Sequence, residues 1–228
     1  METVRRLTTF FSDRLPGLLD FVFPPSCLAC DGRPVTACGI FCAACAMTVD
    51  EVPPVVEMPE NGPLRHLHSP LAYGGALAEA VIRCKHAGMP AFARALAGFA
   101  ARRALLPPVD LVLPVPLHRA RLARRGYNQA ALIARAVSRI LGAPWSPSLL
   151  LRVKDTSSQG GLTRAGRFEN LKGAFAVPGP ARRRIAGRRV LLVDDVWTTG
   201  ATCHACARAL LGAGAAQVTA FTVCRVAR

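Results

Sequence analysis

Two adjacent acids and a turn rich in threonine and glycine lie within residues 190–202. Four apolar residues, 190–193, precede Asp194 and Asp195. Small residues, most of them hydroxyl-bearing, follow: Thr198, Thr199, Gly200, Ala201 and Thr202. The order predicts a buried strand that ends in two carboxylates, then a helix whose first backbone N–H groups have no partner within the helix. Such N–H groups bind phosphate, and a glycine beside them lets the backbone approach closely.

The two carboxylates require a different part of the ligand, because they repel a phosphate. They accept hydrogen bonds from two neighbouring hydroxyls of a sugar, or they hold a hydrated Mg²⁺ ion. Ribose 5-phosphate carries its hydroxyls and its phosphate in the matching order. The alternative, an acidic strand end followed by an ordinary helix cap, explains neither the second acid nor the repeated threonines.

Four cysteines near the N-terminus have the spacing of a metal site. Cys27 and Cys30 form one C-x2-C pair, Cys42 and Cys45 form another, and eleven residues separate the pairs. This spacing predicts one tetrahedral Zn²⁺ ion in a closed shell of thiolates, which makes its role structural. Cys38 lies between the pairs and is an alternative to Cys42, and buried thiols without metal are the competing interpretation.

A basic cluster follows the apolar run 111–115. It contains one histidine and four arginines: His118, Arg119, Arg121, Arg124 and Arg125. A diphosphate group needs cationic donors of this kind, and we expect Arg119 and Arg125 to contribute to its binding. The alternative is the exposed start of a basic helix, because arginine is common throughout this half of the chain.

Three further segments have weaker chemical signals. Residues 155–161 are small and polar, as expected of a loop that closes over a ligand or of an ordinary surface loop. Residues 85–88, Lys-His-Ala-Gly, are candidates for contact with an acceptor molecule or for plain surface. Cys203 and Cys206 share one helix face, which would allow a second metal site, but small buried thiols are the simpler interpretation.

The net charge of +15 is confined to one half of the chain. Residues 1–110 hold ten basic and ten acidic side chains, whereas 111–228 hold nineteen basic and four acidic ones. We expect this half to attract phosphates, in nucleotides or in nucleic acid, and a solvated arginine surface is the alternative. The arginines at 182–184, 188 and 189 lie outside the phosphate turn, and they are expected to bind single-stranded DNA.

Elsewhere the chain alternates short apolar runs with helical patterns. Strands are expected at 71–73, 109–115, 149–153, 175–177, 190–193 and 218–223, and helices at 76–86, 90–105, 127–141 and 201–212. The pattern predicts an α/β fold with a mainly parallel, doubly wound sheet. We expect this domain to span 71–228, after a zinc ribbon at 25–50 and a proline-rich linker at 51–70.

The first residues have their own pattern. Apolar residues at steps of three and four predict an amphipathic helix within 1–24, which docks on the domain or, as the alternative, contacts a membrane surface. Every 18-residue stretch carries charge, so we expect no transmembrane helix, and Asp13, Arg14 and Asp20 interrupt any signal peptide. Nine cysteines, an odd number, also argue against a disulfide framework, and together these features predict a cytoplasmic protein.

At the acid pair the chain resembles the type I phosphoribosyltransferases, whose signature is an apolar strand, two acids and a Thr/Gly loop. The whole chain is similar to the ComF family, with a cysteine-rich ribbon followed by motifs at 114–129, 156–170 and 190–202. The resemblance implies that Asp194 and Asp195, the catalytic acids, contact the ribose hydroxyls of 5-phosphoribosyl 1-diphosphate (PRPP). It implies that residues 198–202 hold the 5′-phosphate. It also implies a role in natural transformation, the passage of incoming single-stranded DNA into the cytosol.

Two functions remain open from the sequence. In the first, the protein is a phosphoribosyltransferase in which Mg²⁺ and arginines stabilise the departing diphosphate while a nitrogen acceptor attacks the ribose. In the second, it is a non-enzymatic factor that senses PRPP or a nucleotide and binds single-stranded DNA or proteins of DNA uptake or replication. Aromatic residues make up 6% of the chain and are sparse among the basic segments, which gives little support to base stacking.

Overall fold

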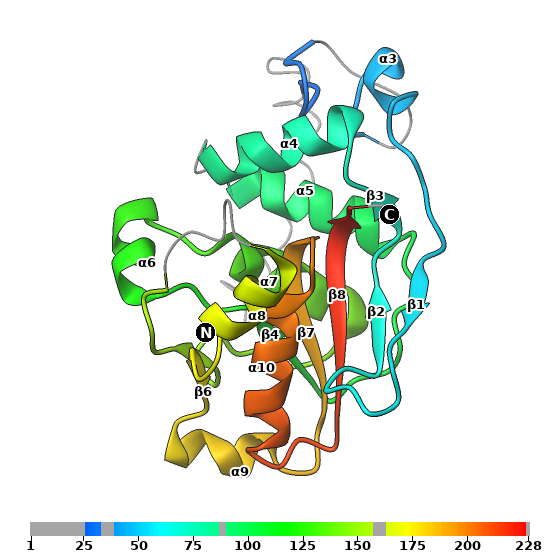
Figure 1. The fold of residues 1–228 in the computed structure, drawn as a ribbon. Helices are drawn as coiled ribbons and strands as arrows, with labels where there is room; N and C mark the ends of the chain where they lie inside the picture. Colours follow the sequence, from blue (N-terminus) through cyan, green and yellow to red (C-terminus); the bar gives the residue numbers. More distant parts are fainter. Residues whose placement is uncertain (1–25, 33–38, 87–89, 157–162, 227–228) are drawn as a thin grey trace, which may run out of the picture.

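A mainly parallel sheet forms the centre of the molecule. The computed structural model describes residues 26–32, 39–86, 90–156 and 163–226 (Figure 1). The strands of the sheet are β1 (Val55–Glu57), β2 (His66–His68), β3 (Leu71–Ala72), β4 (Leu111–Pro114), β7 (Arg189–Trp197) and β8 (Gln217–Arg225). They run in the order β1-β2-β8-β7-β4, with β3 also on β8, and every pair except β1–β2 is parallel. The predicted α/β fold with a mainly parallel sheet is confirmed.

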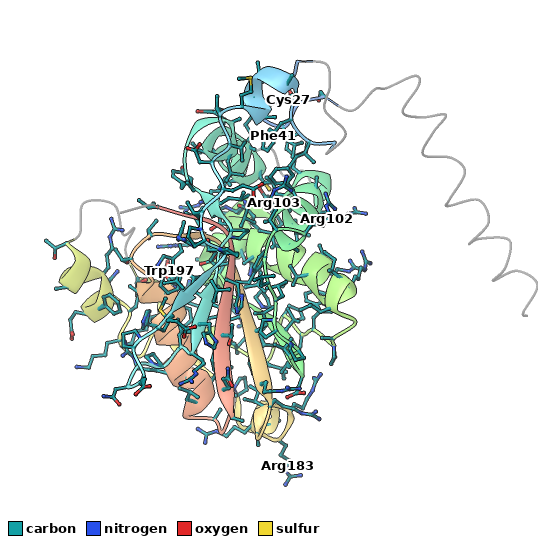
Figure 2. The ribbon with its side chains drawn as sticks, turned by 90° about the vertical axis from the view of Figure 1, so that its right-hand side faces the viewer. Cys27, Phe41, Arg102, Arg103, Arg183 and Trp197 are labelled. Atoms are coloured by element: carbon teal, nitrogen blue, oxygen red, sulfur yellow. The ribbon has the colours of Figure 1, made fainter. Side chains whose placement is uncertain are left out.

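Helices cover both faces of this sheet. They are α3 (Ala43–Ala46), α4 (Gly75–His86), α5 (Pro90–Ala101), α6 (Arg119–Arg125), α7 (Gln129–Leu141), α8 (Arg164–Asn170), α9 (Arg182–Ile185) and α10 (Ala201–Leu211), with a 3₁₀ turn at Gly179–Ala181. On β7, Leu191 and Val193 pack into a core with α4, α5 and α7, whereas Val190 and Leu192 pack into a second core with α10. Figure 2 shows the orange α10 and the green α7 on opposite sides of the strands. This double burial explains why residues 190–193 of β7 form an unbroken apolar run.

The start and end of α7 follow from its flanking residues. Asn128 caps the helix, because its Oδ1 accepts a hydrogen bond from the backbone N–H of Ala130 at 3.1 Å. The amide Nδ2 of the same residue donates to the carbonyl oxygen of Val115 at 3.0 Å, which ties the helix to the end of β4. The helix ends at Gly142, whose φ of 63° is the left-handed conformation that glycine adopts readily.

Two segments differ from the sequence-based expectation. Residues 51–70, for which a linker is expected, contain β1 and β2, and β2 joins the sheet beside β8. Three-residue strands between prolines leave almost no periodicity in a sequence, which is why the pattern does not reveal them. Residues 149–153 and 175–177 do form strands, β5 (Leu151–Arg152) and β6 (Phe175–Ala176), but they pair only with each other, antiparallel, outside the main sheet.

The cysteine-rich segment packs against the α/β core. Cys27, Leu28, Ile40 and Phe41 belong to the same buried cluster as α4, α5 and α7. The ring of Phe41 meets that of Phe99 edge-on, with centroids 5.5 Å apart. The expected helix at 1–24 lies outside the described residues. Within the part of the chain that the structure describes, no helix is long and apolar enough to cross a lipid bilayer.

Candidate functional site

The acid pair lies where the sheet loses one of its strands. The last residue pair between β4 and β7 joins Pro114 to Val193, and the backbone N–H of Val115 donates to the carbonyl oxygen of Val193 at 2.8 Å. Beyond this point, within the described residues, β7 pairs with β8 alone, and Asp194 lies opposite Thr222. Asp194 and Asp195 therefore belong to β7 itself, which continues four residues beyond the predicted strand, at the carboxyl end of a parallel sheet. Ligands bind at this end in open α/β folds.

The two carboxylates point to opposite faces of the sheet, as successive strand residues do. Asp195 faces α4, where its Oδ2 lies 3.0 Å from the Nζ of Lys85, and its side chain is only 14% exposed. Each carboxylate also accepts a backbone hydrogen bond from the next residue. The N–H of Asp195 donates to Oδ1 of Asp194 at 2.9 Å, and the N–H of Val196 donates to Oδ1 of Asp195 at 2.7 Å. The Oδ1 atoms are thus held by the backbone, which fixes the direction of both Oδ2 atoms.

The pKa values reflect these different surroundings. Burial, and then the charge of Asp195, raises the pKa of Asp194 to about 8. On the other face, burial lowers the pKa of Lys85. The nearby carboxylate of Asp195 outweighs this effect, so the pKa of the ammonium is raised. Burial and then the charge of Asp194 raise the pKa of Cys203 in α10, whereas at Cys224 the charge that adds to burial is that of Asp195. The pair therefore combines one carboxyl that favours its neutral form with one carboxylate held by a cation.

The turn after β7 is shaped by Gly200 and Trp197. Gly200 has φ of 76°, and a Cβ placed there would lie 2.2 Å from the indole ring of Trp197. The Oγ1 of Thr199 accepts from the N–H of Ala201 at 3.4 Å, and the Nδ1 of His204 donates to the carbonyl oxygen of Gly200 at 2.8 Å. The rings of Trp197 and His204 lie 5.6 Å apart, so aromatic packing supports the turn from below. The N-terminus of α10 is thereby presented beside the acid pair, as the sequence predicts.

Arg152 of β5 is a buried cation that sequence reasoning missed. It is 9% exposed, its guanidinium donates to the hydroxyl of Thr156, and its Nε has no hydrogen-bond partner among the described residues. Burial, and then the charge of Arg121, lowers its pKa, and the charges of Asp155 and Asp194 oppose this. The sequence feature that could have identified Arg152 is its position as a single charged residue within the apolar run 149–153. Its positive charge lies near the acid pair on the α10 side.

Of the basic cluster on α6, Arg121 contacts the segment 155–156 that follows β5, whereas Arg119 and Arg125 are exposed. Arg121 donates to the carbonyl oxygen of Thr156, and its Nε lies 3.5 Å from Oδ1 of Asp155. Within the described parts of the chain, Arg119 and Arg125 are exposed and make no ion pair. The remainder of the loop predicted to close over a ligand, 157–161, lies outside the described residues.

The end of α4 is anchored next to the site. The hydroxyl of Tyr127 donates to the carbonyl oxygen of Cys84 at 2.6 Å, which links α4 to the turn before α7. This contact holds the neighbouring Lys85 where it meets Asp195. Lys85 was predicted as an acceptor-side or surface residue, and the structure instead brings it to the acid pair; residues 87–89 lie outside the described part of the chain.

The four cysteines predicted as metal ligands lie together. The Sγ atoms of Cys27, Cys30, Cys42 and Cys45 are all within 4.8 Å of one another, and those of Cys30 and Cys42 are 3.8 Å apart. Zn–S bonds of about 2.3 Å give a tetrahedron with edges of about 3.8 Å, so the thiols fit a tetrahedral metal ion. Burial opposes ionisation of Cys27, but backbone N–H groups directed at its sulfur lower its pKa to about 6. Cys38, the alternative to Cys42, lies outside the described residues.

Comparison with known proteins agrees with this geometry. The family model described as the phosphoribosyl transferase domain matches residues 127–228, which contain the acid pair and the phosphate turn. Competence protein F of Haemophilus influenzae is 39% identical over 116 residues, 51% of this chain and 50% of that protein. The DNA utilization protein YhgH of Salmonella typhi is 38% identical over 120 residues, 53% of this chain and 51% of that one.

A third relative, competence protein ComFC of Bacillus subtilis, is 33% identical over 116 residues, 50% of this chain and 44% of that protein. The chain thus spans about half the length of the curated relatives it matches. Among solved structures, a glutamine PRPP amidotransferase from B. subtilis aligns with 57% of this chain and 26% of its own, at 18% identity and a TM-score of 0.40. Residues 127–228 thus match the family model described as the phosphoribosyl transferase domain, and the chain is similar to the competence protein F, ComFC and YhgH proteins.

Proposed function

We propose that the carboxyl end of β7 binds PRPP. The observation that carries this proposal is the juxtaposition of an acid pair and a helix N-terminus at the strand end, within a phosphoribosyl transferase domain. Asp194 and Asp195 accept hydrogen bonds from the ribose hydroxyls. The turn at 198–202 holds the 5′-phosphate through backbone N–H groups and threonine hydroxyls.

Cations around the acid pair suit the diphosphate group of this ligand. Lys85 on the α4 side lies 3.0 Å from Asp195, and the buried Arg152 of β5 interacts electrostatically with Asp194. A sugar hydroxyl that reaches Oδ2 of Asp195 competes with Lys85, so ligand binding releases this ammonium to interact with phosphate oxygens. The exposed Arg119 and Arg125 are proposed as further diphosphate ligands, because α6 follows the end of β4 at the same edge of the sheet.

Two metal ions belong to this proposal. Mg²⁺ typically binds one or two carboxylates together with substrate phosphates, and the Oδ2 atoms at the strand end are suitable hard ligands. Bound Mg²⁺ would neutralise charge on the diphosphate. Zn²⁺ would be held by Cys27, Cys30, Cys42 and Cys45, where a closed thiolate shell stabilises the fold of the segment.

The proposed reaction class is phosphoribosyl transfer, in which the bond between ribose C1 and the diphosphate breaks and a bond to a nitrogen acceptor forms. The proposed biological role is the handling of single-stranded DNA, because two relatives are named competence proteins and a third is named a DNA utilization protein. The charge of the half 111–228, nineteen basic against four acidic residues, suits a polyanionic partner.

Calorimetry with PRPP and Mg²⁺ tests the ligand assignment. We expect Asp194→Asn/Asp195→Asn to weaken PRPP binding by roughly two to four orders of magnitude, because each lost charge-assisted hydrogen bond is worth about 1.5–3 kcal/mol. The matched control is Glu57→Gln/Glu60→Gln, which removes the same charge from another edge of the molecule and should bind as wild type does. Equal PRPP affinity in the wild type and the Asp194/Asp195 variant would refute the assignment.

A diphosphate-release assay separates binding from turnover. Wild-type protein with PRPP and a panel of nucleobases is expected to release diphosphate slowly or not at all. Rapid release that the Asp194/Asp195 variant abolishes would instead establish a full transferase and identify its acceptor.

A further inference from the structure

A groove lined by arginines lies between α5 and α7, away from the acid pair. Arg94 of α5 and Arg135 and Arg139 of α7 line a hollow of about 270 Å³, together with Leu132 and Ala136. Within the described ranges of the chain, no carboxylate forms an ion pair with any of the three arginines. The groove therefore carries positive charge that no described carboxylate neutralises, and Leu132 and Ala136 make its floor apolar.

Nothing in the packing of α7 requires these charges. Arg135 and Arg139 are exposed and lie four residues apart on one helix, a spacing at which like charges repel and destabilise the helix. Arg94 adds a third positive charge across the groove. A bound anion would relieve this repulsion, although Arg139 also lies in the last turn of α7, where a positive charge stabilises the helix end.

We infer that this groove binds the phosphate backbone of single-stranded DNA. Four helical residues rise by about 6 Å, so Arg135 and Arg139 are spaced to contact successive phosphates of an extended strand. Guanidinium groups bind phosphate oxygens in a bidentate manner, and the side chains of Leu132 and Ala136 can contact the deoxyribose between them. The hollow of about 270 Å³ lies between the arginines, so the backbone of one strand can run along them.

The inference concerns the DNA-handling part of the proposed function and is independent of the PRPP site. It also differs from the sequence-based expectation, which places DNA on the arginines around α9. Those side chains are exposed at the amino-terminal end of β7, and Arg183 points outward into solvent at the lower end of the view in Figure 2. One neighbour, Arg189, is already paired with Asp110, at 2.9 Å between Nη2 and Oδ1. The three arginines of α9 therefore provide a matched control.

Fluorescence anisotropy with labelled single-stranded DNA over a range of salt concentrations tests the groove on the full chain. An oligonucleotide of about 20 residues exceeds the usual site size for one domain. We expect Arg94→Gln/Arg135→Gln/Arg139→Gln to lower affinity at least tenfold and to reduce the salt slope by about 2, because each lost phosphate contact removes about 0.7. Arg182→Gln/Arg183→Gln/Arg184→Gln is expected to change the slope by less than one contact. Lysine at the three groove positions should retain most of the slope, because the charge remains.

Three outcomes would overturn the inference. One is an unchanged salt slope in the folded groove variant, as judged by circular dichroism. Another is an equal loss in the α9 variant or equal affinity for a duplex of the same length, either of which indicates general charge attraction. The third is competition by inorganic diphosphate as effective as that by DNA, which indicates a small-anion site. PRPP calorimetry on the same preparations should be unaffected by the groove variant, so failure of the PRPP site and failure of the groove remain distinguishable.

Discussion

Asp194 and Asp195 have the same type of side chain, but their different surroundings give the two carboxyl groups different chemistry. The carboxyl of Asp194 lies beside α10, where burial raises its pKa to about 8. The carboxylate of Asp195 lies 3.0 Å from the ammonium of Lys85. In the proposed complex both residues accept hydrogen bonds from sugar hydroxyls, so binding must favour the ionised form of Asp194 and displace Lys85 from Asp195. The difference arises because successive residues of β7 point to opposite faces.

Asp194→Asn should make the protein more stable than the wild type at alkaline pH. The pKa of Asp194 is raised from 3.8 to about 8 in the folded protein, so the stability contributed by its protonated form is fully present below pH 3.8. This contribution is lost as the pH rises through about 8. A tenfold change in an ionisation constant corresponds to ~1.4 kcal/mol, and the neutral amide should gain at least ~1 kcal/mol over the wild type.

Urea denaturation at a series of pH values measures this difference. Glu57→Gln, an exposed carboxylate at the sheet edge, serves as the control and should follow the wild-type curve. Parallel curves for the wild type and the Asp194 variant across this pH range would contradict the assigned environment of Asp194.

β7, the turn after it and α10 form one unit that presents the N–H groups proposed to bind phosphate. The strand holds the acids, Gly200 reverses the chain with φ of 76°, and α10 begins at Ala201. The indole of Trp197 covers the turn so closely that only a hydrogen atom fits on Gly200. His204, one turn into the helix, donates back to the carbonyl oxygen of Gly200, which closes the unit.

Gly200→Ala should damage this unit both in stability and in ligand binding. The methyl group meets the Trp197 ring at 2.2 Å, and alanine is unfavourable at positive φ. The two costs together are about 2–4 kcal/mol. We expect lower denaturation midpoints, altered Trp197 fluorescence and weaker PRPP binding. Gly179→Ala, where a Cβ has open space, is the control; equal stability of the two variants would show that the turn is not constrained by the indole.

At the scale of the whole molecule, α4 connects the cysteine cluster to the acid pair. Its first turn is fixed by Thr48, whose Oγ1 accepts from the N–H of Ala76 at 3.0 Å, and its last turn carries Lys85. Between these ends, Arg83 contacts Asp31 of the cysteine-rich segment. Figure 1 shows this segment resting on α4 at the carboxyl-end side of the sheet, opposite α9. A structural change at the cysteines can therefore shift α4 and, with it, Lys85 beside the proposed ligand site.

Purified protein should contain one zinc ion per chain, and Cys42→Ser should release it. Structural zinc contributes roughly 10–16 kcal/mol in small zinc-binding peptides, so the segment from 25 to 50 should lose its fold without the metal. The α/β domain should remain folded but become less stable. Cys27, Ile40 and Phe41 pack into the same core as α7, whereas the second core, around α10, contains no residue of this segment.

Metal analysis and hydrogen exchange measure the two effects. Cys206→Ala, which removes a buried thiol of α10, should retain its zinc. Absence of zinc in wild-type protein purified with a reductant would refute the metal assignment. Global unfolding of the Cys42 variant would instead show that the segment and the domain fold as one unit.

The sequence by itself determined the elements that carry strong local patterns. The apolar runs of β4, β7 and β8, the helical periodicity of α7 and α10, and the C-x2-C spacing were all readable, because each depends on residues close together in the chain. The order of acids, turn and helix was readable for the same reason. These local patterns were sufficient to predict the α/β class and the order of strand, turn and helix around residues 190–211.

Only the tertiary structure decided which distant residues surround that turn. Lys85 of α4 contacts Asp195, and the buried Arg152 of β5 feels the charge of Asp194; both positions depend on how helices and strands pack rather than on spacing. The groove of Arg94, Arg135 and Arg139 likewise exists only because α5 and α7 lie side by side on one face of the sheet. Charge pairing, burial and shared hollows depend on distances in space. A linear pattern records such distances only within one element.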